Sequence, residues 1–554
     1  MGIVLITLYL AVLLLLCGYG LHRARLAWLC LRCQPSLLTD GSAPILADGS
    51  APILADGSAP IADGSAPMLR DGSAPMLRDG SASNAVAHGS AVAVSLSADS
   101  SAAGASADEL PFITVQLPIY NEATVVQRLL EAASKLVYPR HRLEIQVLDD
   151  SDDETRVIAE GIVHRLRETG LDIAYVRRTS REGYKAGALD FGLQRARGEL
   201  IAIFDADFVP PADFLMATVG HFRQADVGMV QGRWGHLNRD ANMLTSLQAL
   251  MLDGHHLVEN RARFASGCFF NFSGTAGMWR RRAIDDAGGW QHDTLTEDLD
   301  LSYRAQLAGW RFIYRPDVVA PSELPEDVFA FRAQQYRWPK GTVQTARKLL
   351  PSVLNARISR QKRLEALFHL TPHFAYPLMI LLCLLLPFAL VMLPVADDWV
   401  ALLIVDVPLC FGATGSLAAF YAMANRAQGR SIGEAMVKLP ALMALGIGLS
   451  PYLTRAVFEG LAHDAGEFVR TPKRGLRASR YRQLRAPLPL SELALALVGV
   501  ASVVISIETN HFLATPFAML FAFGYAYMAG LMTTEQLARR RALAPSAASV
   551  IAKI

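Results

Sequence analysis

IAIFDAD, at residues 201–207, is the stretch that decides the fold class of this chain. Its apolar run is typical of a fully buried strand, and two carboxylates spaced two residues apart follow at the strand end. Such oxygen ligands suit Mg²⁺ or Mn²⁺, which takes phosphate oxygens in its remaining positions. Aspartates also occur in plain strand-end turns, but a turn alone does not require this spacing. We therefore predict that Asp205 and Asp207 bind a divalent cation and, through it, a diphosphate.

Short β-branched runs alternate with helical patterns on both sides of this stretch. Strands separated by helices indicate an α/β domain with a mostly parallel sheet, and such sheets bind ligands at the carboxyl ends of their strands. We assign this domain to residues 110–345. The predicted strands cover residues 113–117, 145–148, 173–176, 200–204 and 227–231.

Composition points to a membrane protein. Of the 554 residues 52% are hydrophobic, and the mean hydropathy of +0.25 is too high for a purely soluble chain. The net charge of +2 argues against a nucleic-acid partner and leaves the lipid bilayer as the predicted surroundings. Six scattered cysteines give no disulfide framework.

Five apolar segments are predicted to cross the bilayer. A sixth, 436–458, contains Pro440, Pro451 and Arg455, and its crossing would put a strongly basic loop outside, against the positive-inside rule. We therefore predict that 436–458 is an interface helix. The α/β domain and the carboxyl terminus are then predicted to face the cytoplasm, in a multi-pass protein of the inner or plasma membrane. The five predicted spans are 3–19, 368–394, 399–423, 489–507 and 511–532.

The chain divides into six predicted parts. An Asp-Gly-Ser-Ala repeat at 40–109 cannot bury enough apolar area to fold and is predicted to be a flexible linker. The others are a transmembrane anchor (1–39), the α/β domain (110–345), amphipathic interface helices (346–367), a transmembrane region (368–535) with a loop at 464–485, and a cytoplasmic tail (536–554).

Two further groups of polar residues are predicted to face a nucleotide. Asp149 ends the strand 145–148, next to the strand end that carries Glu122, where acceptor groups can bond a base and a ribose; helix capping by Asp150 is the alternative. Lys185 stands at a helix start after Gly183 and is well placed for phosphate.

A third group is predicted to serve the acceptor side. Asp298 follows Glu297 at the start of a helix, where it is either a helix cap or a general base that takes a proton from a hydroxyl. The Gln334, Arg337 and Trp338 cluster offers an aromatic surface beside a guanidinium, which suits a sugar ring and a charged leaving group.

In this order, these motifs resemble those of the processive family 2 glycosyltransferases, which include cellulose, chitin and hyaluronan synthases. The resemblance covers residues 110–345, and the text around Lys185 and around Phe272 to Gly277 is most similar to plant cellulose-synthase-like glucomannan synthases and their bacterial relatives. It implies a GT-A domain, the fold of nucleotide-diphospho-sugar transferases, joined to an α-helical transmembrane channel.

The resemblance also implies a role for each matching residue. Arg470 departs from the family's gating loop, so loop insertion over the nucleotide is the least secure of these roles. The implied donor contacts are Tyr120, Glu122, Asp149, Lys185, Gln334 and Arg337; the metal ligands Asp205 and Asp207; the base Asp298; the acceptor contacts Trp338, Gly274, Thr275 and Glu297; and the gating residues Phe468, Thr471 and Lys473.

The function expected is inverting transfer of a hexose from UDP-glucose or GDP-mannose to a growing β-glycan, which the helices would secrete. Accessory export subunits would be further partners. One alternative is a glycolipid synthase that adds a single hexose to a membrane lipid such as diacylglycerol. Another, of a different class, is a transporter or scaffold with a degenerate transferase domain. Product size and the effect of Asp298→Asn separate these readings.

Overall fold

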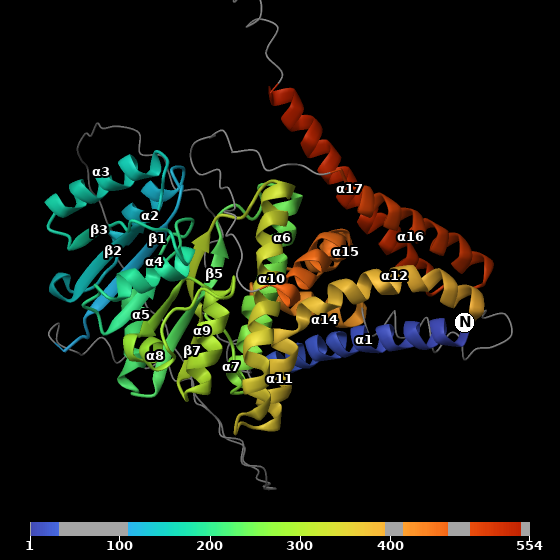
Figure 1. Ribbon diagram of the computed structural model, residues 1–554, viewed down its shortest axis with the longest axis horizontal. Helices are drawn as coiled ribbons and strands as arrows, with labels where there is room; N and C mark the ends of the chain where they lie inside the picture. The colour runs from blue at the N-terminus through green and yellow to red at the C-terminus, as the bar shows by residue number, and fades with distance from the viewer. Residues whose placement is uncertain (1, 33–108, 394–413, 464–487, 544–554) are drawn as a thin grey trace, which may run out of the picture.

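The computed structural model describes residues 2–32, 109–393, 414–463 and 488–543. Figure 1 shows an α/β domain on one side, from which long helices extend on the other. The predicted linker lies outside the described residues apart from Glu109, and the whole of the predicted 464–485 loop lies outside them as well.

Seven strands form one sheet in the order β3-β2-β1-β4-β6-β5-β7. All neighbouring pairs are parallel except those of β6, which runs antiparallel to β4 and β5. The prediction of a mostly parallel sheet is confirmed. The strands are β1 (Ile113–Ile119), β2 (Leu143–Asp149), β3 (Ile173–Val176), β4 (Leu200–Ile203), β5 (Val227–His236), β6 (Gly277–Arg280) and β7 (Arg311–Ser322).

Helices cover both faces of the sheet, which explains why β4 is apolar throughout. Leu200 and Ala202 face one hydrophobic core, whereas Ile201 and Ile203 face another, as the two-residue period of a strand requires. The domain's helices are α2 (Val126–Ala133), α3 (Thr155–Glu168), α4 (Tyr184–Leu193), α5 (Phe214–Val219), α6 (Met243–Gly254), α7 (Arg261–Ala265), α8 (Arg281–Asp286) and α9 (Glu297–Leu307), with short helices η2 (Arg140–Arg142), η3 (Gly220–Arg223) and η4 (His255–Asn260).

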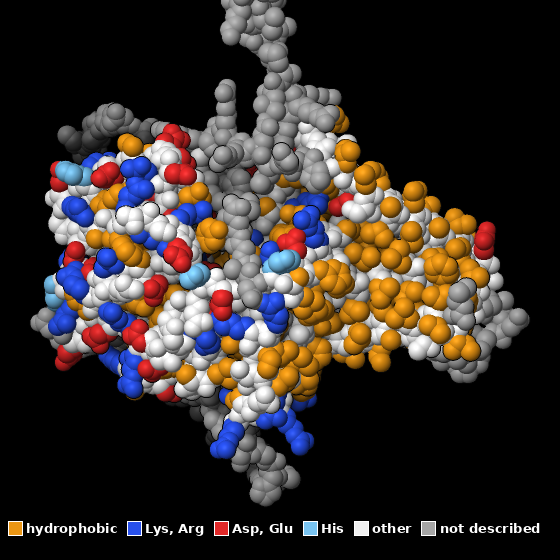
Figure 2. Space-filling model, in the orientation of Figure 1, with side chains coloured by type: hydrophobic (Ala, Val, Ile, Leu, Met, Phe, Trp, Pro, Cys, Tyr) orange, Lys and Arg blue, Asp and Glu red, His pale blue; other side chains and the backbone are white. Residues whose placement is uncertain are grey.

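α1 and the helices that follow the α/β domain carry a broad exposed apolar surface (Figure 2). They are α1 (Gly2–Arg32), α10 (Val328–Asn355), α11 (Arg360–Leu370), η5 (Pro372–Phe374), α12 (Ala375–Met392), α14 (Ser416–Ala427), α15 (Ile432–Ala462), α16 (Leu490–Glu508) and α17 (Thr515–Leu543). Among the described residues, five helices are long and apolar enough to cross a membrane: Gly2–Arg32, Pro372–Met392, Ile432–Ala462, Leu490–Glu508 and Thr515–Ala538.

The predicted interface segment 436–458 lies within α15, one of these five helices. Near one end of α15, Lys438 Nζ donates to Ser246 Oγ of α6 at 2.5 Å, and near the other end Glu459 pairs with Lys340 of α10 at 3.0 Å. Both ends of the helix therefore contact the α/β domain or the helix that follows it. Its position at the membrane interface stays a prediction, as does the span at 399–423, of which only residues 414–423 are described.

One buried carboxylate joins three separate parts of the chain. Glu365 of α11 accepts hydrogen bonds from Arg25 of α1 at 2.8 Å and from Arg263 of α7 at 3.0 Å, and it lies 3.0 Å from the imidazole of His22. Burial alone would raise the pKa of Glu365, but His22 and Arg263 outweigh it and lower the pKa to about 2. The carboxylate is therefore ionised at all physiological pH values.

We expect Glu365→Gln to destabilise the protein by about 1.5–3 kcal/mol, because Arg263, with a side chain only 3% exposed, would lose the nearer of its two carboxylate partners and keep only Glu259, at 3.5 Å. Thermal unfolding of the purified protein in detergent measures this. The control is Asp286→Asn, which removes an exposed pair with Arg282 and is expected to cost about 0.5 kcal/mol or less. Equal melting temperatures for the two variants would contradict the prediction.

Candidate active site

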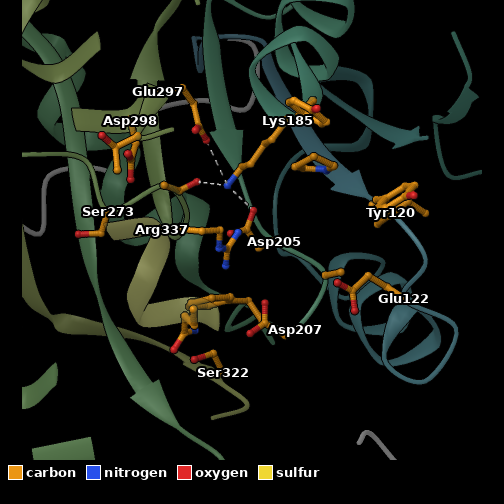
Figure 3. Close-up of a pocket in the computed structure, with 18 of the residues that line it drawn as sticks. Tyr120, Glu122, Lys185, Asp205, Asp207, Ser273, Glu297, Asp298, Ser322 and Arg337 are labelled. Atoms are coloured by element: carbon orange, nitrogen blue, oxygen red, sulfur yellow. Dashed lines mark hydrogen bonds and ion pairs between the residues drawn. The ribbon is translucent and has the colours of Figure 1, made fainter. Parts of the chain in front are cut away.

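A pocket opens where the sequence predicts it, beyond the carboxyl ends of β1 and β4 (Figure 3). Figure 3 places Tyr120 on one side and Glu297 and Asp298 on the other, with Lys185 and Asp205 between them. The polar and aromatic side chains that line it include Tyr120, Glu122, Asp150, Arg181, Tyr184, Lys185, Asp205, Asp207, Trp234, Ser273, Glu297, Asp298, Gln334, Arg337 and Trp338.

Lys185 is the central cation of the pocket. Its Nζ lies 2.5 Å from Asp205 Oδ1 and 4.0 Å from Glu297 Oε1, and it donates to the carbonyl of Gly274 at 2.8 Å. Burial lowers the pKa of Lys185, but the carboxylates of Asp205 and Glu297 more than offset this and leave the pKa raised. The ammonium is therefore permanently charged and faces where an anionic ligand would lie.

Asp298 has the electrostatics of a proton acceptor. It stands in the first turn of α9, where one carboxylate oxygen accepts from the backbone N–H of Leu299 at 2.8 Å. Burial and the neighbouring charge of Glu297 raise the pKa of Asp298 to about 7, and burial also raises that of Glu297. A carboxyl group that titrates near neutrality is suited to general base catalysis.

Asp205 and Asp207 both face the pocket, at the end of β4. Burial raises the pKa of Asp205, and its backbone N–H donates to Thr275 Oγ1 at 2.9 Å. Thr275 thus supports Asp205 from behind, and it is fully buried. No group of three or more His, Cys, Asp or Glu side chains within the described ranges is arranged to hold a metal ion. Two carboxylates fit a divalent cation when a bound diphosphate supplies further oxygens.

Of the two neighbouring aspartates at the end of β2, Asp149 was predicted to face the pocket, but Asp150 is the one that lines it. Asp149 is buried, and its oxygens accept from the N–H of Ser151 and the hydroxyl of Tyr175, both at 2.7 Å. Asp150 lines the pocket instead and forms two hydrogen bonds with Arg178, at 2.8 and 2.6 Å. The role of Asp149 at a nucleoside stays a prediction.

The structure brings most other predicted residues to the same pocket. Gln334, Arg337 and Trp338 reach it from α10, and Gly274 lies beside Asp298. The predicted gating residues Phe468, Thr471 and Lys473 lie outside the described residues.

Sequence reasoning missed Arg181, Tyr184, Trp234 and Ser273 as pocket residues. The Arg181 guanidinium lies 3.3 Å from the ring centroid of Tyr120. The position of Arg181 in the turn just before Lys185 was the sequence signal that could have identified it as a pocket residue.

Residues 111–341 match the family described as glycosyltransferase like family 2, and the domain that they form belongs to it. The domain is thus a glycosyltransferase domain of the GT-A fold. The chain is similar to Glucomannan 4-beta-mannosyltransferase 1 of Oryza sativa subsp. japonica, with 40% identity over 267 residues. These residues make up 47% of this chain and 51% of the relative, so the chain spans about half the length of that relative.

Two solved structures are also similar. A mannosyltransferase from Pyrobaculum calidifontis in complex with GDP-Man and Mn²⁺ has 25% identity and a TM-score of 0.44, covering 60% of this chain and 88% of that chain. TarS 1–349 of S. aureus in complex with UDP-GlcNAc has 16% identity and a TM-score of 0.34, covering 63% and 89%.

Gly274 offers a test of the packing around Asp298. Its φ is +80°, and a Cβ there would lie 3.0 Å from Asp298 Oδ2. We expect Gly274→Ala to displace that carboxylate and to lower the rate of sugar transfer at least about tenfold, in keeping with the tight positional demands of catalysis.

The matched control is Gly170→Ala. Gly170 has nearly the same φ, +78°, but a Cβ there meets nothing within 4 Å. Both variants are expected to lose about 1–2 kcal/mol of stability from the left-handed backbone, and only Gly274→Ala is expected to lose activity. Thermal unfolding and transfer assays on the two proteins together measure this, and equal activities would contradict the prediction.

Proposed function

We propose that the chain is an inverting hexosyltransferase that moves a sugar from a nucleotide diphosphate donor to a glycan. The observation that carries this proposal is that one pocket holds both a partly buried lysine, Lys185, and a carboxyl group, Asp298, that titrates near neutrality. Lys185 and Asp298 both lie beside Gly274, with Asp205 paired to the lysine.

In the proposed reaction Asp298 accepts the proton of an acceptor hydroxyl, whose oxygen then forms a bond to the anomeric carbon as the bond to the diphosphate breaks. One displacement inverts the anomeric configuration. Lys185 and Arg337 bind the departing diphosphate, and the indole of Trp338 offers a flat surface for the acceptor sugar.

Asp205 and Asp207 would hold a divalent cation, Mg²⁺ or Mn²⁺, which when bound neutralises charge on the diphosphate. The chemistry of the donor set supports this proposal, because two hard carboxylates face the position where phosphate oxygens would complete the coordination sphere. Thr275 fixes the backbone at Asp205 and so helps to orient that ligand.

The donor is proposed to be GDP-mannose or UDP-glucose, and the similarity to the rice mannosyltransferase favours mannosyl transfer. The acceptor is proposed to be the end of a growing mannan-like or cellulose-like glycan. The protein is proposed to lie in a cell membrane with its donor site facing the cytoplasm. The apolar helices would carry the product across the membrane, with accessory export subunits as further partners.

Asp298→Asn tests the base. We expect the rate of transfer to fall by at least about a hundredfold, because the amide cannot accept the proton, while binding of the nucleotide changes little. The control is Asp240→Asn, an exposed aspartate outside the pocket lining. Full activity of Asp298→Asn would refute the assignment of the base.

The pH dependence gives a second test. Asp298 must be ionised to act, and its pKa is raised from an ordinary value near 4 to about 7. We therefore expect kcat/KM to rise about tenfold per pH unit below pH 7 and to level off above it. An enzyme whose activity is already constant from about pH 5 upward would contradict this, because its base would then have an ordinary carboxyl pKa.

A donor screen on purified membranes tests the substrate and product. We expect release of GDP or UDP from one donor and a labelled polymer. A single labelled lipid without polymer would support the glycolipid synthase instead, and release of neither nucleotide would reject the proposed function.

A further inference from the structure

The donor side of the pocket contains an arginine whose hydrogen-bonding groups are not used by the protein. Arg181 lines the pocket, and its guanidinium carbon lies 3.3 Å from the centroid of the Tyr120 ring and 4.9 Å from that of Tyr184. Among the described residues, its N–H groups have no hydrogen-bond acceptor and no ion-pair partner. Lys185, by contrast, is paired with Asp205.

The turn that presents Arg181 is held by several hydrogen bonds from one side chain, that of Arg178. Arg178 donates to the carbonyls of Glu182 and Tyr184, at 2.5 and 2.6 Å, while it also bonds Asp150. Gly183 and Tyr184 both have positive φ, +69° and +49°, the second of which is strained for a residue with a side chain. A turn over-determined in this way places Arg181 before any ligand arrives.

The position of Arg181 assigns it to one part of a nucleotide sugar. Figure 3 shows Tyr120, on which Arg181 rests, on the opposite side of Lys185 and Asp205 from Asp298. In the proposed function the reacting sugar lies by Asp298 and the diphosphate by Lys185. The nucleobase then lies by Tyr120 and Arg181.

At 3.3 Å a guanidinium avoids a clash only by lying flat on the aromatic ring, so its N–H groups point outward in its own plane. A base that continues this plane meets them with its edge. Guanine presents the acceptors O6 and N7 side by side, so it can accept two hydrogen bonds from adjacent N–H groups of the guanidinium. Uracil has no two adjacent acceptors, because an N–H separates its two carbonyl groups.

We propose that Arg181 selects a guanine nucleotide donor over a uracil one by donating two hydrogen bonds to O6 and N7 of the base. This inference rests on the proposed function and deepens it, since it decides between the two donors left open above. The inference also explains the strained turn before α4, because that turn holds the guanidinium of Arg181 in place.

The test measures binding of GDP and of UDP, each with Mg²⁺, to the full-length protein in detergent. The wild-type protein is expected to bind GDP about tenfold to a hundredfold more tightly than UDP, the range of one good bidentate contact. Arg181→Lys keeps the charge but not the fork. It is expected to lower the affinity for GDP to near that for UDP and to change the affinity for UDP less than about threefold.

Two control variants make the result specific. Arg195 also stacks on an aromatic ring, that of Phe191 at 3.6 Å, but lies outside the pocket lining, so Arg195→Lys is expected to leave both affinities unchanged. Lys185→Ala is expected to weaken GDP and UDP equally, as loss of a phosphate contact requires.

Equal losses of GDP and UDP affinity in Arg181→Lys would overturn the inference, because Arg181 would then act on the diphosphate. A wild-type protein that binds UDP as tightly as GDP would overturn it as well. Both results would leave the proposed function standing. If neither nucleotide bound the wild-type protein, the proposed function would fail, and the inference with it.

Discussion

The pocket depends on the ion pair between Lys185 and Asp205, because it lets several carboxylates share a buried space. Asp205, Glu297 and Asp298 all have raised pKa values through burial, and Lys185 opposes this shift in each of them. Without that ammonium the three groups would repel one another and take up protons at a higher pH. The lysine therefore favours the ionised form of Asp298 against burial and the charge of Glu297, which raise the pKa of that carboxyl group.

The same balance explains why the proposed ligand is a complex of diphosphate with a cation. Carboxylic side chains outnumber cationic ones along the pocket lining, and Asp150 is already neutralised by Arg178. A diphosphate alone would add negative charge to a pocket that is acidic, so its binding requires positive charge to enter with it. A divalent cation beside Asp205 and Asp207 meets this requirement.

The sequence predicted the parts of the fold that follow a simple period and missed those that do not. β4 was recognisable because helices cover both of its faces, and Asp205 and Asp207 follow from it. β6 has only four residues, and β7 carries two prolines and charged residues, so neither shows a clear strand pattern. Arg181 was missed because its importance comes from the turn geometry and from Tyr120, which lies 61 positions away in the chain but next to it in space.

The helix α10 connects the proposed acceptor side of the pocket to the apolar helix α15. Trp338 and Arg337 lie on it, and within about one turn Tyr336 packs on Tyr452 of α15 and Lys340 pairs with Glu459. Gly460 lets the two helices approach closely, since a Cβ there would lie 2.7 Å from the carbonyl of Lys340. Because α15 also contacts α6 through Lys438, α15 links α10 to a helix of the α/β domain. The surface proposed to bind the acceptor sugar is thus positioned by packing against an apolar helix.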